Sequence, residues 1–149
     1  MKNSAKESSE KLKILVAEEN QEACSALEEL LKVLGHSVMV TQDGEDALNM
    51  FHETIPDLVF SGLTLPKLGG MELLREVKSG SGKTLFVMIC PMSDPEKIQQ
   101  ALKKGAADFL TRPIQSRELI RSLDRLVNLK RGFITSPRVN ETTPNPESD

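Results

Sequence analysis

Several groups that can do chemistry stand at the ends of short apolar runs. The acidic pair Glu18-Glu19 follows the run LKILVA, Cys90 follows TLFVMI, and Arg112 follows DFLT. Paired carboxylates suit a hard divalent cation such as Mg²⁺. A guanidinium pairs with a carboxylate or a phosphoryl group, and a thiol becomes redox-active where its pKa is lowered. A further apolar run, DLVFSG, ends instead at Gly62, which has no side chain.

The apolar runs have the length and composition of strands buried on both faces. They cover residues 12–17, 37–41, 57–62, 84–89 and 108–111, and they alternate with stretches of helical periodicity at 21–34, 44–51, 70–78, 93–105 and 116–130. This alternation predicts an α/β fold with a parallel sheet and helices on both faces. Since the carboxyl ends of parallel strands meet at one edge, Glu18-Glu19, Gly62, Cys90 and Arg112 should share one crevice.

The composition indicates a single globular domain with an aliphatic core, since 38% of the residues are hydrophobic and 3% are aromatic. The net charge of -3, without a basic block, gives no electrostatic basis for binding nucleic acid or an anionic membrane. The two cysteines are far apart in sequence, which predicts a reduced, intracellular protein without disulfides. No apolar run suggests a membrane span or a signal peptide, so we expect a cytoplasmic protein.

Both ends of the chain differ in composition from the rest. Residues 1–10 are polar, and residues 131–149 are rich in Pro, Ser and Thr. Such compositions predict a disordered leader and a disordered tail around an ordered domain at 11–130.

Segments containing the strand ends are similar to those of a known family. The segments KILVAEEN, PDLVFSGLTLPKLGGMELL, FVMICP and GAADFLTRP, in this order, resemble the receiver domain of two-component response regulators from about Leu12 to Lys130. The resemblance implies a flavodoxin-like (βα)5 three-layer sandwich, with a five-stranded parallel sheet in the order 2-1-3-4-5. It also implies a role in phosphorelay signal transduction. In typical receivers an acidic pair holds Mg²⁺, an aspartate takes a phosphoryl group, a Ser/Thr follows the phosphate and a lysine pairs with it.

The chain departs from that pattern at the positions that carry the chemistry. Gly62 matches the phosphoacceptor, Cys90 the Ser/Thr, and Arg112 the lysine, so no aspartyl phosphate can form at position 62. We therefore expect an atypical pseudo-receiver that acts through phosphorylation-independent protein contacts. It is not expected to be an enzyme, because no nucleophile-base pair is visible among the crevice residues.

The remaining crevice groups have simpler interpretations. Glu18 and Glu19 are the candidate metal ligands, but one carboxylate of the usual three is missing; no resident cofactor is expected, and Mg²⁺ is the ion to test. Arg112 can instead pair with Glu18 or Glu19. Cys90 would be a redox sensor only if Arg112 lowered its pKa.

The resemblance also suggests a partner surface. Phe109 matches the aromatic residue that swings inward on activation in the family, and Pro113 follows Arg112 in the same segment. The face formed by residues 93–130 is the expected contact for a protein partner or a homodimer. The alternatives are a phosphorelay receiver with a non-standard acceptor such as Thr64, and a flavodoxin-like nucleotide or flavin binder. The latter is disfavoured because Glu18-Glu19 would repel a phosphate at the next helix.

Overall fold

The computed structural model describes residues 11–91 and 94–132. Its centre is a parallel sheet with strand order β2-β1-β3-β4-β5. The strands are β1 (Lys13–Ala17), β2 (Ser37–Thr41), β3 (Leu58–Gly62), β4 (Leu85–Cys90) and β5 (Asp108–Thr111). Every strand pair in the ladder is parallel. The predicted sheet and its order are therefore confirmed.

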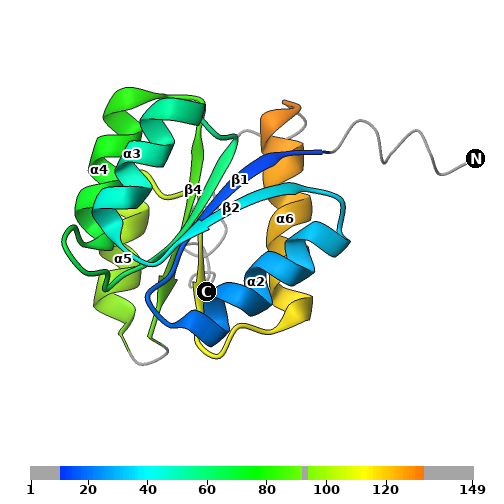
Figure 1. Cartoon of the computed structure of the whole chain (residues 1–149), viewed down its shortest axis with the longest axis horizontal. Helices are drawn as coiled ribbons and strands as arrows, with labels where there is room; N and C mark the ends of the chain where they lie inside the picture. The colour runs from blue at the N-terminus through cyan, green and yellow to red at the C-terminus, as the bar shows by residue number, and fades with distance from the viewer. Residues whose placement is uncertain (1–10, 92–93, 133–149) are drawn as a thin grey trace, which may run out of the picture.

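Helices cover both faces of the sheet (Figure 1). They are α2 (Gln21–Val33), α3 (Gly44–Thr54), α4 (Gly70–Gly80), α5 (Pro95–Lys103) and α6 (Ser116–Lys130). Helices α2 and α6 lie on one face, and α3, α4 and α5 lie on the other. This arrangement is the three-layer, flavodoxin-like (βα)5 fold that the sequence predicted.

The core is divided by the sheet into two aliphatic layers. On the α2–α6 side, Val16, Phe60 and Leu110 pack with buried residues of both helices. On the other side, Val59 and Met88 pack under α3, α4 and α5. Because successive residues of a strand point to opposite faces, each strand contributes to both layers. The face to which a strand's last side chain points therefore depends on whether that residue lies an even or an odd number of positions from a residue whose face is known.

The predicted disordered leader, residues 1–10, and residues 133–149 of the predicted disordered tail at 131–149 lie outside the described residues. Within the described part of the chain, no helix has the length and apolar character needed to cross a bilayer.

Candidate functional site at the carboxyl edge of the sheet

Glu18 is the first residue after β1 and is fully buried. Its Oε1 accepts a hydrogen bond from Nη2 of Arg112 at 2.6 Å, and its Oε2 accepts one from the backbone N–H of Asn20 at 2.9 Å. Asn20 in turn caps α2, because its Oδ1 accepts the N–H of Ala23 at 2.8 Å. The β1–α2 connection therefore holds the Glu18 carboxylate in one position, with both oxygens bonded.

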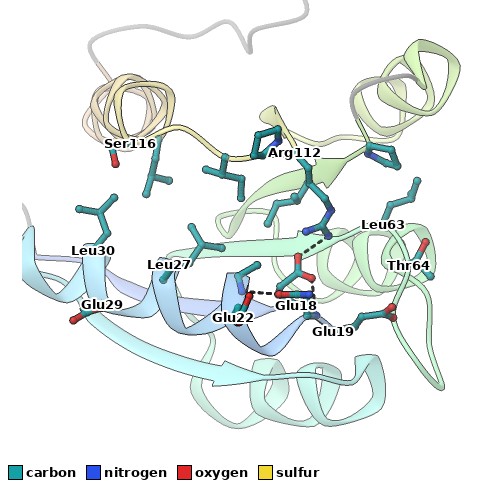
Figure 2. Close-up of a pocket in the computed structure, with 18 of the residues that line it drawn as sticks. Glu18, Glu19, Glu22, Leu27, Glu29, Leu30, Leu63, Thr64, Arg112 and Ser116 are labelled. Carbon is teal, nitrogen blue, oxygen red and sulfur yellow. Dashed lines mark hydrogen bonds and ion pairs between the residues drawn. The ribbon is translucent and has the colours of Figure 1, made fainter.

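Arg112 reaches Glu18 from the opposite edge of the crevice. It directly follows β5, and its backbone N–H donates to the carbonyl of Cys90 at 3.2 Å. The Arg112 side chain is 35% exposed, whereas the Glu18 side chain is 1% exposed. The pair is charge-assisted and short, and the guanidinium neutralises a carboxylate that is otherwise out of reach of water. Figure 2 shows this ion pair at the centre of the crevice.

Gly62 ends β3 directly in front of this ion pair. A Cβ built on Gly62 would lie 3.3 Å from Nη2 of Arg112 and 3.3 Å from Oε1 of Glu18. The Gly62 carbonyl oxygen accepts a hydrogen bond from the Ser61 hydroxyl at 2.9 Å. The space into which a side chain at position 62 would project is therefore bordered closely by the salt bridge.

The alternation of side chains between the two faces of the sheet explains which of the predicted residues meet in the crevice. Val16, Phe60 and Leu110 face the α2–α6 layer. Glu18, Gly62 and Arg112 each lie two positions further along the chain, and the structure brings all three together on that side.

The Cys90 side chain points to the opposite face of the sheet from Glu18, Gly62 and Arg112. It is 0% exposed and packs with Met88 and Ala17 in the other core layer, so its side chain points away from the ion pair. Burial raises the pKa of the Cys90 thiol to about 11, and the charge of Asp94 adds to this against the smaller opposing effect of Arg112. A redox-sensing thiol needs a lowered pKa, so this environment argues against that interpretation.

The other predicted residues lie at the periphery of the crevice. Glu19 and Thr64 are exposed and line its mouth, and Pro113 is exposed and lines the wall beyond Arg112. Phe109 lies in β5 opposite Met88 and is partly buried. Neither Glu19 nor Thr64 forms part of the Glu18–Arg112 ion pair.

The crevice continues into a groove of about 1150 Å³ between α2 and the β5–α6 connection. Figure 2 shows Leu27 and Leu30 of α2 across the groove from Ser116 at the start of α6. The α2 wall was missed at the sequence level, where the partner surface was assigned to residues 93–130. The signal for it is the apolar residue Val33, which falls outside the core stripe of α2.

The donor set does not match what Mg²⁺ requires. This ion prefers octahedral coordination by several oxygen ligands. Position 62 supplies no carboxylate, and the nearer acid, Glu18, already has both oxygens bonded and its charge paired with Arg112. Among the residues that the structure describes, no group of three His, Cys, Asp or Glu residues could hold a metal ion.

Comparisons with known proteins agree with the fold. The family model described as response regulator receiver domain matches residues 14–124. The probable transcriptional regulator ycf27 of Guillardia theta is 31% identical over 121 residues, which cover 79% of this chain and 47% of that protein. The chain therefore spans about half the length of this relative.

Solved structures give the same result. A response regulator receiver domain protein from Clostridium thermocellum is 26% identical, with a TM-score of 0.76 over 82% of this chain and 98% of that one. NtrX from Brucella abortus, solved in complex with ADP, is 26% identical with a TM-score of 0.78, over 83% of this chain and 28% of that one. The chain belongs to the family of response regulator receiver domains, which act in two-component signalling.

Proposed function

We propose that this receiver domain is a pseudo-receiver, which transmits a signal through protein–protein contacts without being phosphorylated in its crevice. The observation that carries the proposal is the Arg112–Glu18 ion pair in front of Gly62. Receiver chemistry needs a carboxylate nucleophile at the end of β3, and glycine provides none. The neighbouring Glu18 is not available to replace it, because both of its carboxylate oxygens are already bonded.

The same geometry supports independence from Mg²⁺. A metal ion at the acidic pair would have to compete with the guanidinium for the Glu18 carboxylate. Displacing Arg112 from Glu18 would break a charge-assisted hydrogen bond of 2.6 Å. Metal binding would have to offset the free energy lost with that bond. We propose that the Arg112 guanidinium supplies the positive charge of the crevice and that no resident metal ion is needed.

The proposal is tested by incubating the full chain with acetyl phosphate and Mg²⁺ and measuring its intact mass at neutral pH, where aspartyl phosphates survive. A typical receiver with its aspartate intact, treated identically, is the positive control. The expected result is no phosphorylated species of this chain while the control is modified. A phosphorylated form of the wild-type chain would overturn the proposal.

One alternative acceptor has a specific observation in its favour. Thr64 is exposed at the mouth of the crevice, so a kinase could reach its hydroxyl. A phosphorelay role through Thr64 predicts a kinase-dependent mass increase that disappears in Thr64→Val. By contrast, Ser61 is fully buried and donates to the Gly62 carbonyl, so it offers no such route.

A nucleotide or flavin binder is less compatible with the groove. Glu19, Glu22 and Glu29 line it and would repel a phosphate. The N-terminus of α2 is already capped by Asn20, which removes one of its free N–H donors. Purified protein with flavin absorbance at visible wavelengths would contradict this reasoning.

A further inference from the structure

Four lysines from different elements gather at the amino edge of the sheet, which is the edge opposite the crevice. Lys13 begins β1, Lys78 lies in the last turn of α4, Lys83 lies just before β4, and Lys130 ends α6. In a parallel α/β fold every strand begins, and every helix ends, at this edge. The fold therefore concentrates positive charge that the sequence spreads over more than a hundred positions. We call these four residues the lysine cluster.

Two of the ammonium groups are held at the connection between α4 and β4. Nζ of Lys130 donates to the carbonyl of Lys83 at 2.6 Å, and Nζ of Lys78 donates to the carbonyl of the next residue, Thr84, at 3.2 Å. An ammonium carries three N–H donors, so each of these groups can still donate to a ligand. Because the two long side chains are already positioned, a ligand loses less conformational entropy in binding them.

Asp57 is the carboxylate that accompanies the cluster. Its Oδ2 accepts the backbone N–H of Lys13 at 2.8 Å, and its Oδ1 lies 3.9 Å from Nζ of Lys130. Within the described part of the chain, the other lysines of the cluster form no ion pair with a carboxylate. One carboxylate therefore accompanies four ammonium groups, and this edge of the sheet has an excess of positive charge that attracts anions.

The environment of Lys78 shows that this arrangement is electrostatically unfavourable without an anion. Its side chain is partly buried, and its stem lies beside Gly105, where a built Cβ would be 3.3 Å from Cγ of Lys78. Burial lowers the pKa of the Lys78 ammonium, and the charge of Lys130 lowers it further. A bound anion in contact with both ammonium groups would offset both effects.

The cluster is accessible and wider than one phosphoryl group. Ile14, Leu58 and Leu85 are in register on β1, β3 and β4, so the residues before them extend across about 10 Å at the usual spacing of neighbouring strands. Lys83 is exposed, and a Cβ built on Gly82 would have no atom of the described residues within 4 Å. A ligand that contacts the whole cluster therefore needs at least two anionic groups.

The connection at residues 80–84, with the sequence GSGKT, has the composition of a phosphate-binding loop but not its structural context. A P-loop follows a strand and opens a helix, whereas this stretch follows α4 and precedes β4. The Thr84 hydroxyl also donates to the carbonyl of Pro56 at 2.8 Å. Recognition at this edge therefore depends on the ammonium groups and not on a helix N-terminus.

We infer that the lysine cluster binds a small anion that carries two or more phosphoryl groups. Lysine binds phosphate as a point charge, and each phosphoryl group offers three acceptor oxygens to the ammonium N–H donors. The inference goes beyond the proposed function, because the cluster lies at the opposite edge of the sheet from the crevice. Modification of the chain by acetyl phosphate would overturn the proposed function and leave this inference standing.

The test titrates sodium diphosphate into the ¹⁵N-labelled full chain in metal-free buffer. Saturable amide shifts are expected at Asp57, Gly82 and Lys83. Orthophosphate should bind about ten-fold more weakly, because it contacts only part of the cluster. Citrate controls for charge alone and should also bind more weakly, since each carboxylate offers two acceptor oxygens. Absence of saturable shifts at these residues, or equal affinity for all three anions, would overturn the inference.

Matched variants separate the cluster from general attraction to a positive surface. Lys83→Gln with Lys130→Gln should weaken diphosphate binding about ten-fold, because two attractive pairs are lost. The control is Lys67→Gln with Lys97→Gln, which removes the same charge at exposed positions elsewhere. Equal losses in the two double variants would contradict the inference.

A third variant should strengthen binding, a result that partial unfolding cannot produce. Asp57→Asn removes the one carboxylate of the cluster and keeps an oxygen that can accept the Lys13 N–H. Diphosphate should bind about three-fold more tightly to this variant. Unchanged or weaker binding by a folded Asp57→Asn chain would count against the site.

ADP distinguishes two sources of the same phosphoryl chemistry. If ADP binds the cluster at least as tightly as diphosphate, the inference holds with a nucleotide as the ligand. If ADP binds more weakly than diphosphate, the inference holds with a free oligophosphate as the ligand. If diphosphate instead shifts the amides of Glu18 and Arg112 in the crevice and not those of the cluster, the inference is wrong.

Discussion

Replacing Arg112 by alanine should destabilise the domain by about 2 kcal/mol. Breaking a fully buried ion pair by removing one partner costs about 3–5 kcal/mol, because a buried charge is left uncompensated. Here Glu18 is buried but Arg112 is 35% exposed, so water can enter the space left by the guanidinium and recover part of the loss. Loss of a hydrogen bond to a charged group, about 1.5–3 kcal/mol, gives a similar figure.

Urea unfolding followed by far-ultraviolet circular dichroism measures this change. With a slope of about 1–3 kcal/mol per molar urea, the midpoint should fall by about 1 M while the slope stays unchanged. Arg112→Lys keeps a positive charge near Glu18 and should cost less than Arg112→Ala. Arg75→Ala is the matched surface control, since Arg75 pairs with Glu76 at 3.6 Å and both side chains are exposed. That variant should lose less than about 0.5 kcal/mol.

A double-mutant cycle isolates the interaction itself. In a Glu18→Gln background the buried negative charge is absent, so Arg112→Ala should cost about 1 kcal/mol or less. If Arg112→Ala is no more destabilising than Arg75→Ala in the wild-type background, the ion pair does not hold the crevice together and this reasoning is refuted.

Three further changes test other parts of the structure. Gly62→Asp should not restore a response to acetyl phosphate, because its Cβ would lie 3.3 Å from Nη2 of Arg112 and its carboxylate would meet an existing ion pair; full phosphorylation, seen by intact mass, would contradict this. Gly70→Ala should destabilise the domain by more than about 3 kcal/mol in urea unfolding, because a Cβ there would clash with the carbonyl oxygen of residue 62. Gly82→Ala should be tolerated, because a Cβ at that position would have no atom of the described residues within 4 Å. The Cys90 thiol should resist alkylation at pH 8 until the protein unfolds. In the folded protein the pKa of the Cys90 thiol is raised from 9.0 to about 11, so the stability that the neutral thiol contributes should be intact below pH 9 and lost as the pH rises toward 11. In urea unfolding measured across this pH range, Cys90→Val should reduce that loss.

The fold could be predicted because the sequence repeats one local pattern. Short apolar runs alternate with helical periodicity, and only a parallel sheet with helices on both faces satisfies that alternation. The convergence of Glu18, Gly62 and Arg112 followed from the same rule, since parallel strands end at one edge. Opposite charges on two of these residues made their pairing a reasonable hypothesis, and the structure contains the Arg112–Glu18 pair.

The direction of Cys90 was available from the sequence but requires the parity of β4. Phe86, Met88 and Cys90 alternate onto the α3–α5 side, whereas Val87 and Ile89 face α2 and α6. A position at the end of a strand is therefore insufficient to place a side chain in the crevice. By the same alternation the Ser61 side chain points to the face opposite that of Phe60, and its hydroxyl donates to the Gly62 carbonyl.

The groove could not be predicted because it depends on the spacing between two helices. Helical periodicity alone places Ala23, Leu27, Leu30 and Leu31 on one broad stripe. The structure divides that stripe, burying Leu27 and Leu31 while leaving Ala23 and Leu30 partly exposed in the groove. Only the packing of α2 against the sheet decides where that division falls.

The most direct test of the central claim is an amide NMR titration of the full chain with beryllofluoride and Mg²⁺, which together mimic an aspartyl phosphate. A chain that signals without phosphorylation should show no saturable shifts at Glu18, Gly62 or Phe109, while a receiver with its aspartate intact shifts under the same conditions. Saturable shifts at these residues in the wild-type chain would show that the crevice still recognises a phosphoryl group, and the claim would be wrong.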